Sequence, residues 1–407
     1  MKSRAEASAA VVGGSIGGCA AALALHRAGF GSVTVHERTD GDLADRGVGI
    51  GVHGARYEEL AAAGFLDAGM AHVALVERRW YVRDGPGPGP GLGRRIRTDS
   101  FPFRTYAWGP LWRELRARVP GPVAFHQGSA VLAVEDTPVG AEVRTADGRT
   151  ARHDLVIGAD GYRSTVRDAV CPRARPGYAG YLAWRGAYPE ERLPDGERWP
   201  RDAAAYVVFP GGHAVIYRIP DGAGGRRVNW VLYAAPPPGL DLPLTTPTSL
   251  PPGTLSTALR THIARLAHDH LPSFWGRLIE VTEPEELFVQ PMYDVTAEPG
   301  VTGRLALLGD AATIARPHTG AGAVKALQDA ALLEAALSGA PDPAAALARY
   351  DSARAALGRT MVDLGRRLGA ALVTSTPDWP SLDGPALAAW WQRADATGAF
   401  GGRRLPD

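Results

Sequence analysis

The sequence predicts an α/β protein in which a domain built on a parallel sheet is interrupted by a mainly antiparallel β-sheet and followed by C-terminal helices. Three observations predict this architecture. The chain begins with a strand, a glycine-rich turn, a helix and a second strand in residues 9–38. Aromatic and β-branched runs separated by turns occupy residues 178–233. The apolar run "RLALLGD", residues 304–310, then has the character of a buried parallel strand again.

The first element is a βαβ unit. "AAVVGG" is a short β-branched run, and "GGCAAALALHRAGF" has the apolar spacing of a helix that ends on Gly29. "SVTVHER" is a second strand. Two strands that flank a helix in this way lie parallel with a right-handed crossover.

The second sheet is predicted from "GYLAWRGAY", "AAYVVFPGG", "HAVIYRIP" and "RRVNWVLYAA", which are strand-like runs divided by turns. The low-complexity stretch at 83–95 is expected to be a hairpin tip or loop, and a helix is expected near 255–270. Asp383 is expected to cap a last short helix. The predicted domains are a discontinuous nucleotide-binding domain of 1–75, 98–175 and 285–365, a substrate domain of 76–97 and 176–284, and a helical tail of 366–407.

Composition narrows the class of protein. The chain has 407 residues, 45% hydrophobic and 21% charged, which is typical of a globular protein with one to three domains. A net charge of +1 favours neither nucleic acid nor an anionic membrane as a partner. The sequence has no apolar run of about 18 residues and no signal peptide, so we expect a cytoplasmic protein, monomer or homodimer, with a small-molecule substrate. Two cysteines make neither a disulfide framework nor a zinc site, and Cys19 is expected to be a packed thiol.

The first motif is "VVGGSIGG", which follows a strand and opens a helix. Gly13 permits the turn, Gly18 lets helix and strand approach closely, and Ser15 replaces the middle glycine of the usual Rossmann-like pattern. The helix N-terminus offers free N–H groups to a pyrophosphate. An acidic residue at the end of the second strand accepts hydrogen bonds from ribose hydroxyls and disfavours a 2′-phosphate, so FAD or NAD is expected rather than NADP. The candidate ligands of the dinucleotide are Gly13, Ser15, Ile16, Gly18, Glu37 and Arg38.

Two later motifs end on an aspartate. Asp160 lies in "DLVIGADGYRSTVR" after a strand, and a lone Asp-Gly of this kind is most often a turn. Asp310 ends the strand "RLALLGD" and precedes a helix that is expected to begin near Gly320-Ala321-Gly322. By itself, Asp310 could be a helix cap or an acceptor for sugar-alcohol hydroxyls beside a site rich in amides.

Together and in this order, the three motifs resemble the FAD-dependent class A aromatic hydroxylases, the family of p-hydroxybenzoate hydroxylase. The resemblance covers residues 8–365. It implies a Rossmann-like FAD-binding domain with bound FAD, NAD(P)H as a transient co-substrate, and O2 that forms a C4a-hydroperoxide. One oxygen atom then passes to an aromatic or heteroaromatic substrate.

The resemblance also implies roles for residues. Asp310 is expected to contact the ribityl chain and Glu37 the ribose, while Arg46 and the backbone at Val131 match segments that usually line FAD, and Asp160 lies in the segment associated with FAD and reduced nicotinamide. The loop expected to face the pyrimidine side of the flavin comprises Pro317, Gly320, Ala321, Gly322 and Ala323. Trp108 replaces an arginine of many members, and "GAGAVK" replaces a frequent Gly-Gln-Gly…Asn run. "PHTGAGAVKALQDA" is similar to the 2,6-dihydroxypyridine 3-hydroxylase branch, which makes a hydroxy-N-heteroaromatic one possible substrate.

The catalytic candidates lie in the aromatic sheet and the late loop. Strand alternation puts His213, Val215 and Tyr217 on one face. The candidates are His213, Tyr217, His318 and Arg185, with Asn229, Trp230 and Gln290 as further side chains of the sheet. A single residue of this kind is more often structural than catalytic. Lys325, one of two lysines in the chain, is expected to be a solvated surface residue.

Other functions fit the same motifs. Epoxidation or hydroxylation of an indole or alkene that triggers cyclisation would use the same flavin chemistry. A flavin halogenase is disfavoured because no Trp-x-Trp-x-Ile-Pro segment is present. From a different class, a carrier of prenylated proteins has the same fold without redox chemistry, and the intact Asp-Gly and Gly-Asp segments argue against it.

Overall fold

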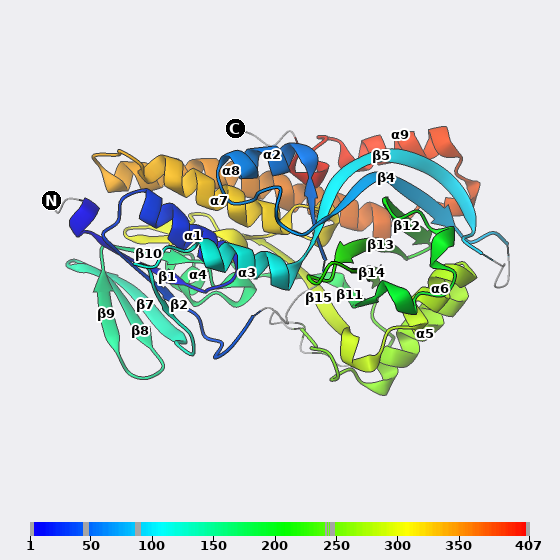
Figure 1. Ribbon diagram of the computed structural model, residues 1–407, viewed down its shortest axis with the longest axis horizontal. Helices are drawn as coiled ribbons and strands as arrows, with labels where there is room; N and C mark the ends of the chain where they lie inside the picture. Colours follow the sequence, from blue (N-terminus) through cyan, green and yellow to red (C-terminus); the bar gives the residue numbers. More distant parts are fainter. Residues whose placement is uncertain are drawn as a thin grey trace.

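The structure, a computed structural model, describes residues 4–43, 49–85, 91–240, 242, 244 and 249–403. Its strands form a mainly parallel sheet, a larger mainly antiparallel sheet and a small third sheet. Figure 1 shows the parallel sheet near one end of the long axis and the large sheet near the other, with the helices α7 and α8 running along the molecule above them. The predicted fold class is confirmed.

The parallel sheet is built around β1 (Ser8–Val12), which pairs in parallel with β2 (Ser32–His36) on one side and β10 (Leu155–Gly158) on the other. The returning strand β17 (Leu305–Leu307) pairs in parallel with β10, as predicted from the sequence. The edges of this sheet are β6 (Ala124–His126) and β16 (Val301–Thr302). Every residue of β10 and β17 is buried, which is expected for parallel strands covered on both faces.

Four helices lie closest to this sheet and its strand ends: α1 (Ile16–Arg27), α3 (Trp108–Arg118), α4 (Thr165–Val170) and α7 (Gly322–Leu337). The first of them, α1, is followed by Gly29 in the left-handed conformation at φ 90°, where the sequence predicted the helix to end. Cys19, in the first turns of α1, is buried and its thiol donates to the Gly14 carbonyl, as expected for a packed cysteine.

The second sheet has nine strands among the described residues, and all neighbouring pairs are antiparallel except β12 with β4. In spatial order its strands are β18 (Thr313–Ile314), β15 (Leu287–Thr296), β11 (Gly177–Pro189), β14 (Arg226–Ala234), β13 (Gly212–Pro220), β12 (Ala203–Phe209), β4 (Val73–Val82), β5 (Arg94–Ala107) and β3 (Gly49–His53). The predicted domain boundaries do not follow this sheet. Strands β3, β15 and β18 and most of β5 come from ranges assigned to the first domain. Hydrophobic alternation identifies a strand and does not say which sheet it joins.

A three-stranded sheet, β7 (Val131–Thr137), β8 (Gly140–Thr145) and β9 (Thr150–His153), packs beside the parallel sheet. The remaining helices are α2 (Gly54–Ala62), α5 (Thr257–His270), α6 (Ser273–Glu280), α8 (Pro343–Gly369) and α9 (Gly384–Asp395). Asp383 caps α9 by accepting a hydrogen bond of 2.8 Å from the Ala386 N–H, as predicted. Among the described residues no helix has the length and apolar character needed to cross a membrane.

The two faces of the nine-stranded sheet have different partners. One face buries Trp184 and Trp230 against α5 and α6. The other face, which carries Tyr206 and Tyr233, packs against the end of α8, the segment Ala370–Thr374 and α9. The C-terminal residues therefore help to enclose this second face, which is the face that turns toward the parallel sheet.

Candidate active site

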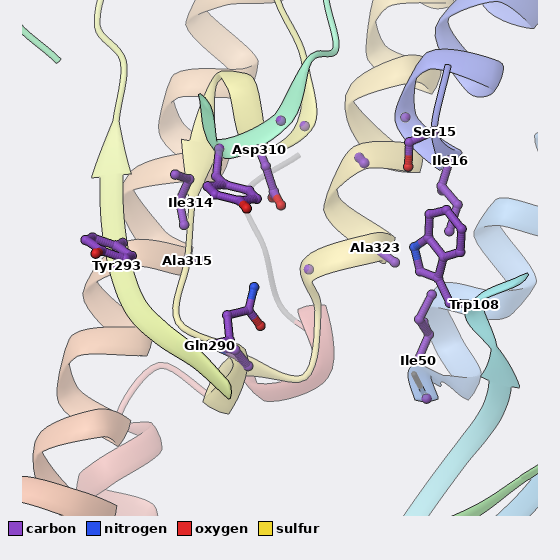
Figure 2. Close-up of a pocket in the computed structure, with 18 of the residues that line it drawn as sticks. Ser15, Ile16, Ile50, Trp108, Gln290, Tyr293, Asp310, Ile314, Ala315 and Ala323 are labelled. Atoms are coloured by element: carbon purple, nitrogen blue, oxygen red, sulfur yellow. The ribbon is translucent and has the colours of Figure 1, made fainter. Parts of the chain in front are cut away.

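A single groove joins the two large sheets. It has a volume of about 640 Å³ and runs from the carboxyl ends of β1, β2, β10 and β17 to the second face of the nine-stranded sheet. Carboxyl ends of parallel strands are the usual place for a ligand in such a sheet, because loops and helix N-termini converge there. Figure 2 shows the first glycine turn on one side of the groove and the late loop on the other, through the labelled residues Ser15, Ile16, Asp310, Ile314 and Ala315.

The first glycine turn is shaped by contacts that exclude side chains. Gly13 has φ 101°, and a Cβ there would lie 2.4 Å from the Ala159 carbonyl oxygen. A Cβ on Gly18 would lie 1.8 Å from the Gly13 carbonyl oxygen, so helix α1 and strand β1 approach as closely as the sequence predicted. Gly14 is equally constrained, because its Cβ would meet Phe125 at 2.6 Å and Glu37 at 2.9 Å. The turn brings the N-terminus of α1 to the wall of the groove.

Glu37, directly after β2, is tied to this turn. One carboxylate oxygen accepts from the Gly14 N–H at 2.8 Å, and the other accepts from the Thr39 N–H at 2.8 Å. The side chain is only 6% exposed and lines the groove. Each oxygen keeps a second lone pair, so the carboxylate can still accept from the hydroxyls of a ligand.

Asp310, at the opposite wall, presents an open carboxylate to the groove. None of the described residues donates a hydrogen bond to its side chain. Although the carboxylate faces open space, protein surrounds the groove, and this burial raises the pKa of Asp310; the Lys325 ammonium acts in the opposite direction. An open acceptor beside an ammonium is suited to hydroxyl groups of a ligand.

Gly309, the residue before Asp310, is held from both sides by a buried ion pair. Lys325 donates to the Gly309 carbonyl at 2.7 Å, while the Gly309 N–H donates to the Asp329 carboxylate at 2.8 Å. The two side chains lie one turn apart on α7, 3.5 Å from each other, and are 2% and 1% exposed. The prediction of a solvated Lys325 is therefore wrong. The sequence did not reveal its partner, because the contact runs through a backbone group of a loop that precedes the helix.

The Asp160 carboxylate accepts hydrogen bonds from residues close to it in the sequence. It accepts from the Ser164 hydroxyl at 2.5 Å and from the Val166 N–H at 3.2 Å, and so orders the start of α4. Burial raises the pKa of Asp160, and these hydrogen bonds lower it again. The residue also lines the groove.

Most of the other predicted cofactor ligands line the same groove. The residues that do so are Ser15, Ile16, Arg38, Val131, Pro317, Gly320, Gly322 and Ala323. Gly18 acts through helix packing, as described above, and Ala321 is 2% exposed in the core beneath the loop. Arg46 lies outside the described residues. Trp108, at the start of α3, lines the groove beside Ile16 and Ile50 (Figure 2).

The predicted catalytic residues meet at the other end of the groove. His213, Tyr217, Arg185 and His318 all line it, and Val215 lies between the first two as the alternation of β13 predicted. Arg185 is the one charged side chain that the described strands of the large sheet contribute to the lining. Its Nε atom is buried and has no hydrogen-bond partner in the described chain.

The remaining candidates divide into two kinds. Gln290 lines the groove, and Asn229 supports it by accepting a hydrogen bond of 2.8 Å from the Gly49 N–H behind Tyr217. Trp230 faces the opposite side of the sheet, where its indole N–H donates to Thr282 at 2.9 Å. Trp230 is therefore structural. Adjacent residues of a strand point to opposite faces of the sheet, so Trp230 points away from the groove if Asn229 points toward it.

Several lining residues escaped the prediction. Tyr233 is paired with His213 across β13 and β14, and Tyr206 lies on the next strand, so the alternation that identified His213 could have identified both. Phe101, Phe103 and Phe400 also line this end. No sequence signal connects Phe400 to the site, because it reaches the groove from the C-terminal tail.

The residues present fit an extended dinucleotide such as FAD. The glycine turn leaves room for backbone N–H groups to approach a pyrophosphate, and the open carboxylate of Asp310 offers an acceptor for a polyol chain. Beyond Asp310 the groove continues into an aromatic compartment. A flat ring system would lie between these two parts.

Comparisons with known proteins agree with this fit. A family model described as a FAD binding domain matches residues 261–364, and one described as FAD binding domain-like matches residues 178–294. The 2,6-dihydroxypyridine 3-monooxygenase of Paenarthrobacter nicotinovorans is 32% identical over 80% of this chain and 81% of the relative. The solved structure of 2,6-dihydroxypyridine-3-hydroxylase from Arthrobacter nicotinovorans superimposes with a TM-score of 0.78 at 25% identity, over 93% of this chain and 96% of that one. Klebsiella pneumoniae HpxO complexed with FAD and uric acid gives 0.75 at 25% identity, over 97% and 94%.

Proposed function

The chain belongs to the FAD-dependent class A aromatic hydroxylases, and on that premise we propose that it uses NAD(P)H and O2 to insert one oxygen atom into an aromatic or N-heteroaromatic substrate. The protein is a flavin monooxygenase with FAD as its cofactor. The substrate class and the positions at which substrate and cofactor bind are the proposal.

One observation carries it. The groove is continuous from Glu37 and the first glycine turn, past Asp310, to His213 and Tyr217 on the large sheet. An extended dinucleotide can therefore reach from one sheet to the other, with its reactive ring at the boundary between the polar and the aromatic compartments. A substrate in the aromatic compartment would meet that ring directly.

Each part of the chain has a distinct task in this proposal. Bound FAD supplies the redox chemistry, in which NAD(P)H provides the electrons and O2 the oxygen atom. Asp310 and Glu37 would hold the sugar-alcohol and ribose hydroxyls, and the N-terminus of α7 beside Gly322 would stabilise negative charge on the bound ring. The phenylalanines of the compartment exclude water from the reacting atoms.

Arg185 suits the activation of the substrate ring. Deprotonation of a ring hydroxyl makes an aromatic ring richer in electrons and easier to oxygenate. The Arg185 guanidinium lies close enough to Tyr217 and Tyr233 to lower the pKa of both phenols, although burial raises each of them more strongly. A positive charge in this compartment favours the anionic form of a bound phenol or hydroxypyridine.

The test is a screen for substrates without oxygen. Hydroxypyridines, phenols and indoles are mixed with the holoenzyme and NAD(P)H, and the rate at which the flavin absorbance bleaches is recorded. We expect a hydroxypyridine or phenol to accelerate bleaching, and product with one added oxygen atom to form when air is admitted. Acceleration by indoles alone would replace ring hydroxylation by epoxidation, and a colourless protein that binds no FAD would refute the proposal.

A further inference from the structure

One wall of the aromatic compartment, the end of the groove that His213 lines, comes from the C-terminal part of the chain. Phe400 lies after α9 in the C-terminal turn, Phe400–Gly402. It lines the groove and is only 4% exposed. Among the described residues beyond Ala326, only Leu372 and Phe400 do so. The turn therefore adds a wall to the substrate end, although it belongs to neither large sheet.

The Phe400 ring lies between the nine-stranded sheet and the loop that precedes α7. On the sheet side its centroid is 5.8 Å from that of Phe103 and 6.1 Å from that of Phe101, and both of these rings of β5 line the groove. On the loop side, a Cβ built on Gly320 would lie 3.7 Å from the Phe400 ring. The ring therefore closes the corner between β5 and this loop.

The C-terminal turn is fixed by hydrogen bonds and by glycine. Asp395, the last residue of α9, accepts from the Phe400 N–H at 3.1 Å, and Arg403 donates to the Phe400 carbonyl at 3.2 Å. Gly401 has φ 71°, which residues with a Cβ rarely adopt, and a Cβ there would lie 2.7 Å from Phe103. A backbone held at these points places the Phe400 ring in one position.

Phe400 is backed by residues that do not reach the groove. The Trp391 ring, from α9, meets it edge to face with centroids 5.2 Å apart, and the Arg78 guanidinium carbon lies 5.5 Å from its centroid. Neither residue lines the groove. Because Phe400 is packed on this side too, it cannot withdraw from the compartment without breaking these contacts, and closely packed interiors resist such shifts.

From these contacts we propose that Phe400 is a specificity-determining residue that limits the size of the aromatic substrate. A ligand that extends into the corner between β5 and the loop would overlap the ring, and forcing a packed ring aside is costly. The C-terminal turn thus favours substrates without a further fused ring at this corner. The inference rests on the proposed function and deepens it, because it assigns a size limit to the same site.

The experiment compares two ligands on the intact holoenzyme. The probes are phenol and 2-naphthol, which differ by one fused ring, and affinity is measured from the change that each causes in the flavin spectrum. Phe400→Ala removes a whole phenyl ring from the wall. Its affinity for 2-naphthol relative to phenol should rise by about 10-fold or more over the wild-type protein, the order of effect expected when overpacking is relieved. Phe400→Leu should give a smaller rise, and Phe400→Trp should lower the ratio.

Trp390→Ala is the matched control. Trp390 is also an aromatic residue of the C-terminal segment, but it packs against Trp379, with centroids 4.8 Å apart, and does not line the groove. Its removal should leave the ratio of the two affinities unchanged. The proposal is overturned if neither Phe400→Ala nor Phe400→Leu changes the ratio, or if Trp390→Ala raises it as much.

FAD affinity separates substrate size from cofactor binding. Phe400→Leu keeps an apolar side chain against Trp391, so it tests the wall if Phe400→Ala does not fold. Both variants should bind FAD as tightly as the wild-type protein in a titration of the apoprotein. If FAD affinity falls while the ratio of the ligand affinities stays the same, Phe400 supports the loop before α7 and does not limit the substrate, which also overturns the proposal.

Failure of the proposed function gives a different result. Flavin bleaching that no aromatic compound accelerates in the wild-type protein would refute the proposed substrate class. Acceleration in the wild-type protein, together with Phe400 variants that keep its size preference, would overturn the role of Phe400 alone. If neither probe changes the flavin spectrum of the wild-type protein or of Phe400→Ala, the compartment does not bind hydroxylated rings, and the inference falls with the proposed function.

Discussion

The two ends of the groove present different kinds of atoms to a ligand. At the parallel sheet the groove is lined by backbone groups and by carboxylates that come soon after strands, as at Gly13, Glu37 and Asp310. At the antiparallel sheet they come from side-chain rings that project from strand interiors, as at His213 and Tyr233. The groups presented at the parallel end therefore depend on where the strands stop. The groups presented at the antiparallel end depend on which residue occupies each position of a strand.

This difference separates what each end can recognise. Backbone amides and strand-end carboxylates suit phosphates and hydroxyls, which any extended dinucleotide carries. Side-chain rings can be exchanged one at a time without disturbing the sheet, so they can adapt to one substrate. The charges differ too: the parallel end contains a fully buried ion pair, Lys325 with Asp329, whereas the antiparallel end contains neutral buried histidines and the Arg185 guanidinium.

The largest effect is expected at the buried ion pair. Lys325→Met leaves the buried Asp329 carboxylate without its counter-charge and releases the Gly309 carbonyl. Breaking such a pair costs about 3–5 kcal/mol of the free energy of unfolding. Denaturant unfolding of the purified variant measures this loss of stability. FAD affinity should fall as well, because the Lys325 ammonium no longer holds Gly309, the residue before Asp310.

A double variant distinguishes charge from packing. Lys325→Met with Asp329→Leu removes both charges, so most of the lost stability should return, since an apolar pair of similar volume is often as stable as the ion pair. FAD affinity should remain low, because Gly309 has lost its hydrogen bonds to both side chains. Equal stability of Lys325→Met and the wild-type protein would show that the pair does not hold this end together.

The next largest effect is expected at Asp310. Asp310→Ala removes the open carboxylate without leaving a partner unsatisfied, so the apoprotein should fold normally. Charge-assisted hydrogen bonds to ligand hydroxyls contribute about 3 kcal/mol, so FAD should bind roughly 100-fold more weakly. Titration of the apoprotein with FAD measures the change. Asp310→Asn, which keeps one acceptor oxygen, should lose less, and a fully yellow Asp310→Ala holoenzyme with normal affinity would refute the assignment.

The sequence predicted the parallel end in more detail than the antiparallel end for a physical reason. Gly13, Glu37 and Asp310 follow the ends of strands, and the steric need for glycine at Gly13 and Gly18 leaves a recognisable pattern in the sequence. Lys325 was misassigned as solvated because its partner is a backbone carbonyl, and no residue pattern reports which carbonyl a side chain will reach.

At the antiparallel end, alternation predicted that His213 and Tyr217 share a face, and the structure confirms it. Alternation could not predict the hydrogen-bond partners of the two histidines, because Leu372 and Tyr181 come from distant segments. Nor could it place Phe400 in the same compartment. Contacts between elements far apart in the chain need the packing of the whole fold, which the local periodicity does not contain.

The smallest effect is expected from the neutral histidines, and its sign follows from linkage. His213 has a pKa of about 3 in the folded protein against 6.5 when exposed, so between these values the unfolded chain binds a proton that the folded chain does not. Its contribution to stability is therefore complete above the exposed value and is lost as the pH falls toward the folded value. From pH 7 to pH 5 the loss is about 2 kcal/mol.

The His213→Phe variant has no imidazole to protonate on unfolding. Between pH 7 and pH 5 its free energy of unfolding should therefore decline by about 2 kcal/mol less than that of the wild-type protein. Urea unfolding of both proteins with excess FAD at the two pH values measures the difference, and comparison of the two proteins cancels the titration of all other groups. His318→Phe should behave in the same way, because its pKa is also lowered by burial. If wild type and His213→Phe lose stability in parallel, His213 is already protonated in the folded protein. It would then carry a hydrogen on both ring nitrogens and offer no acceptor to a ligand in the groove.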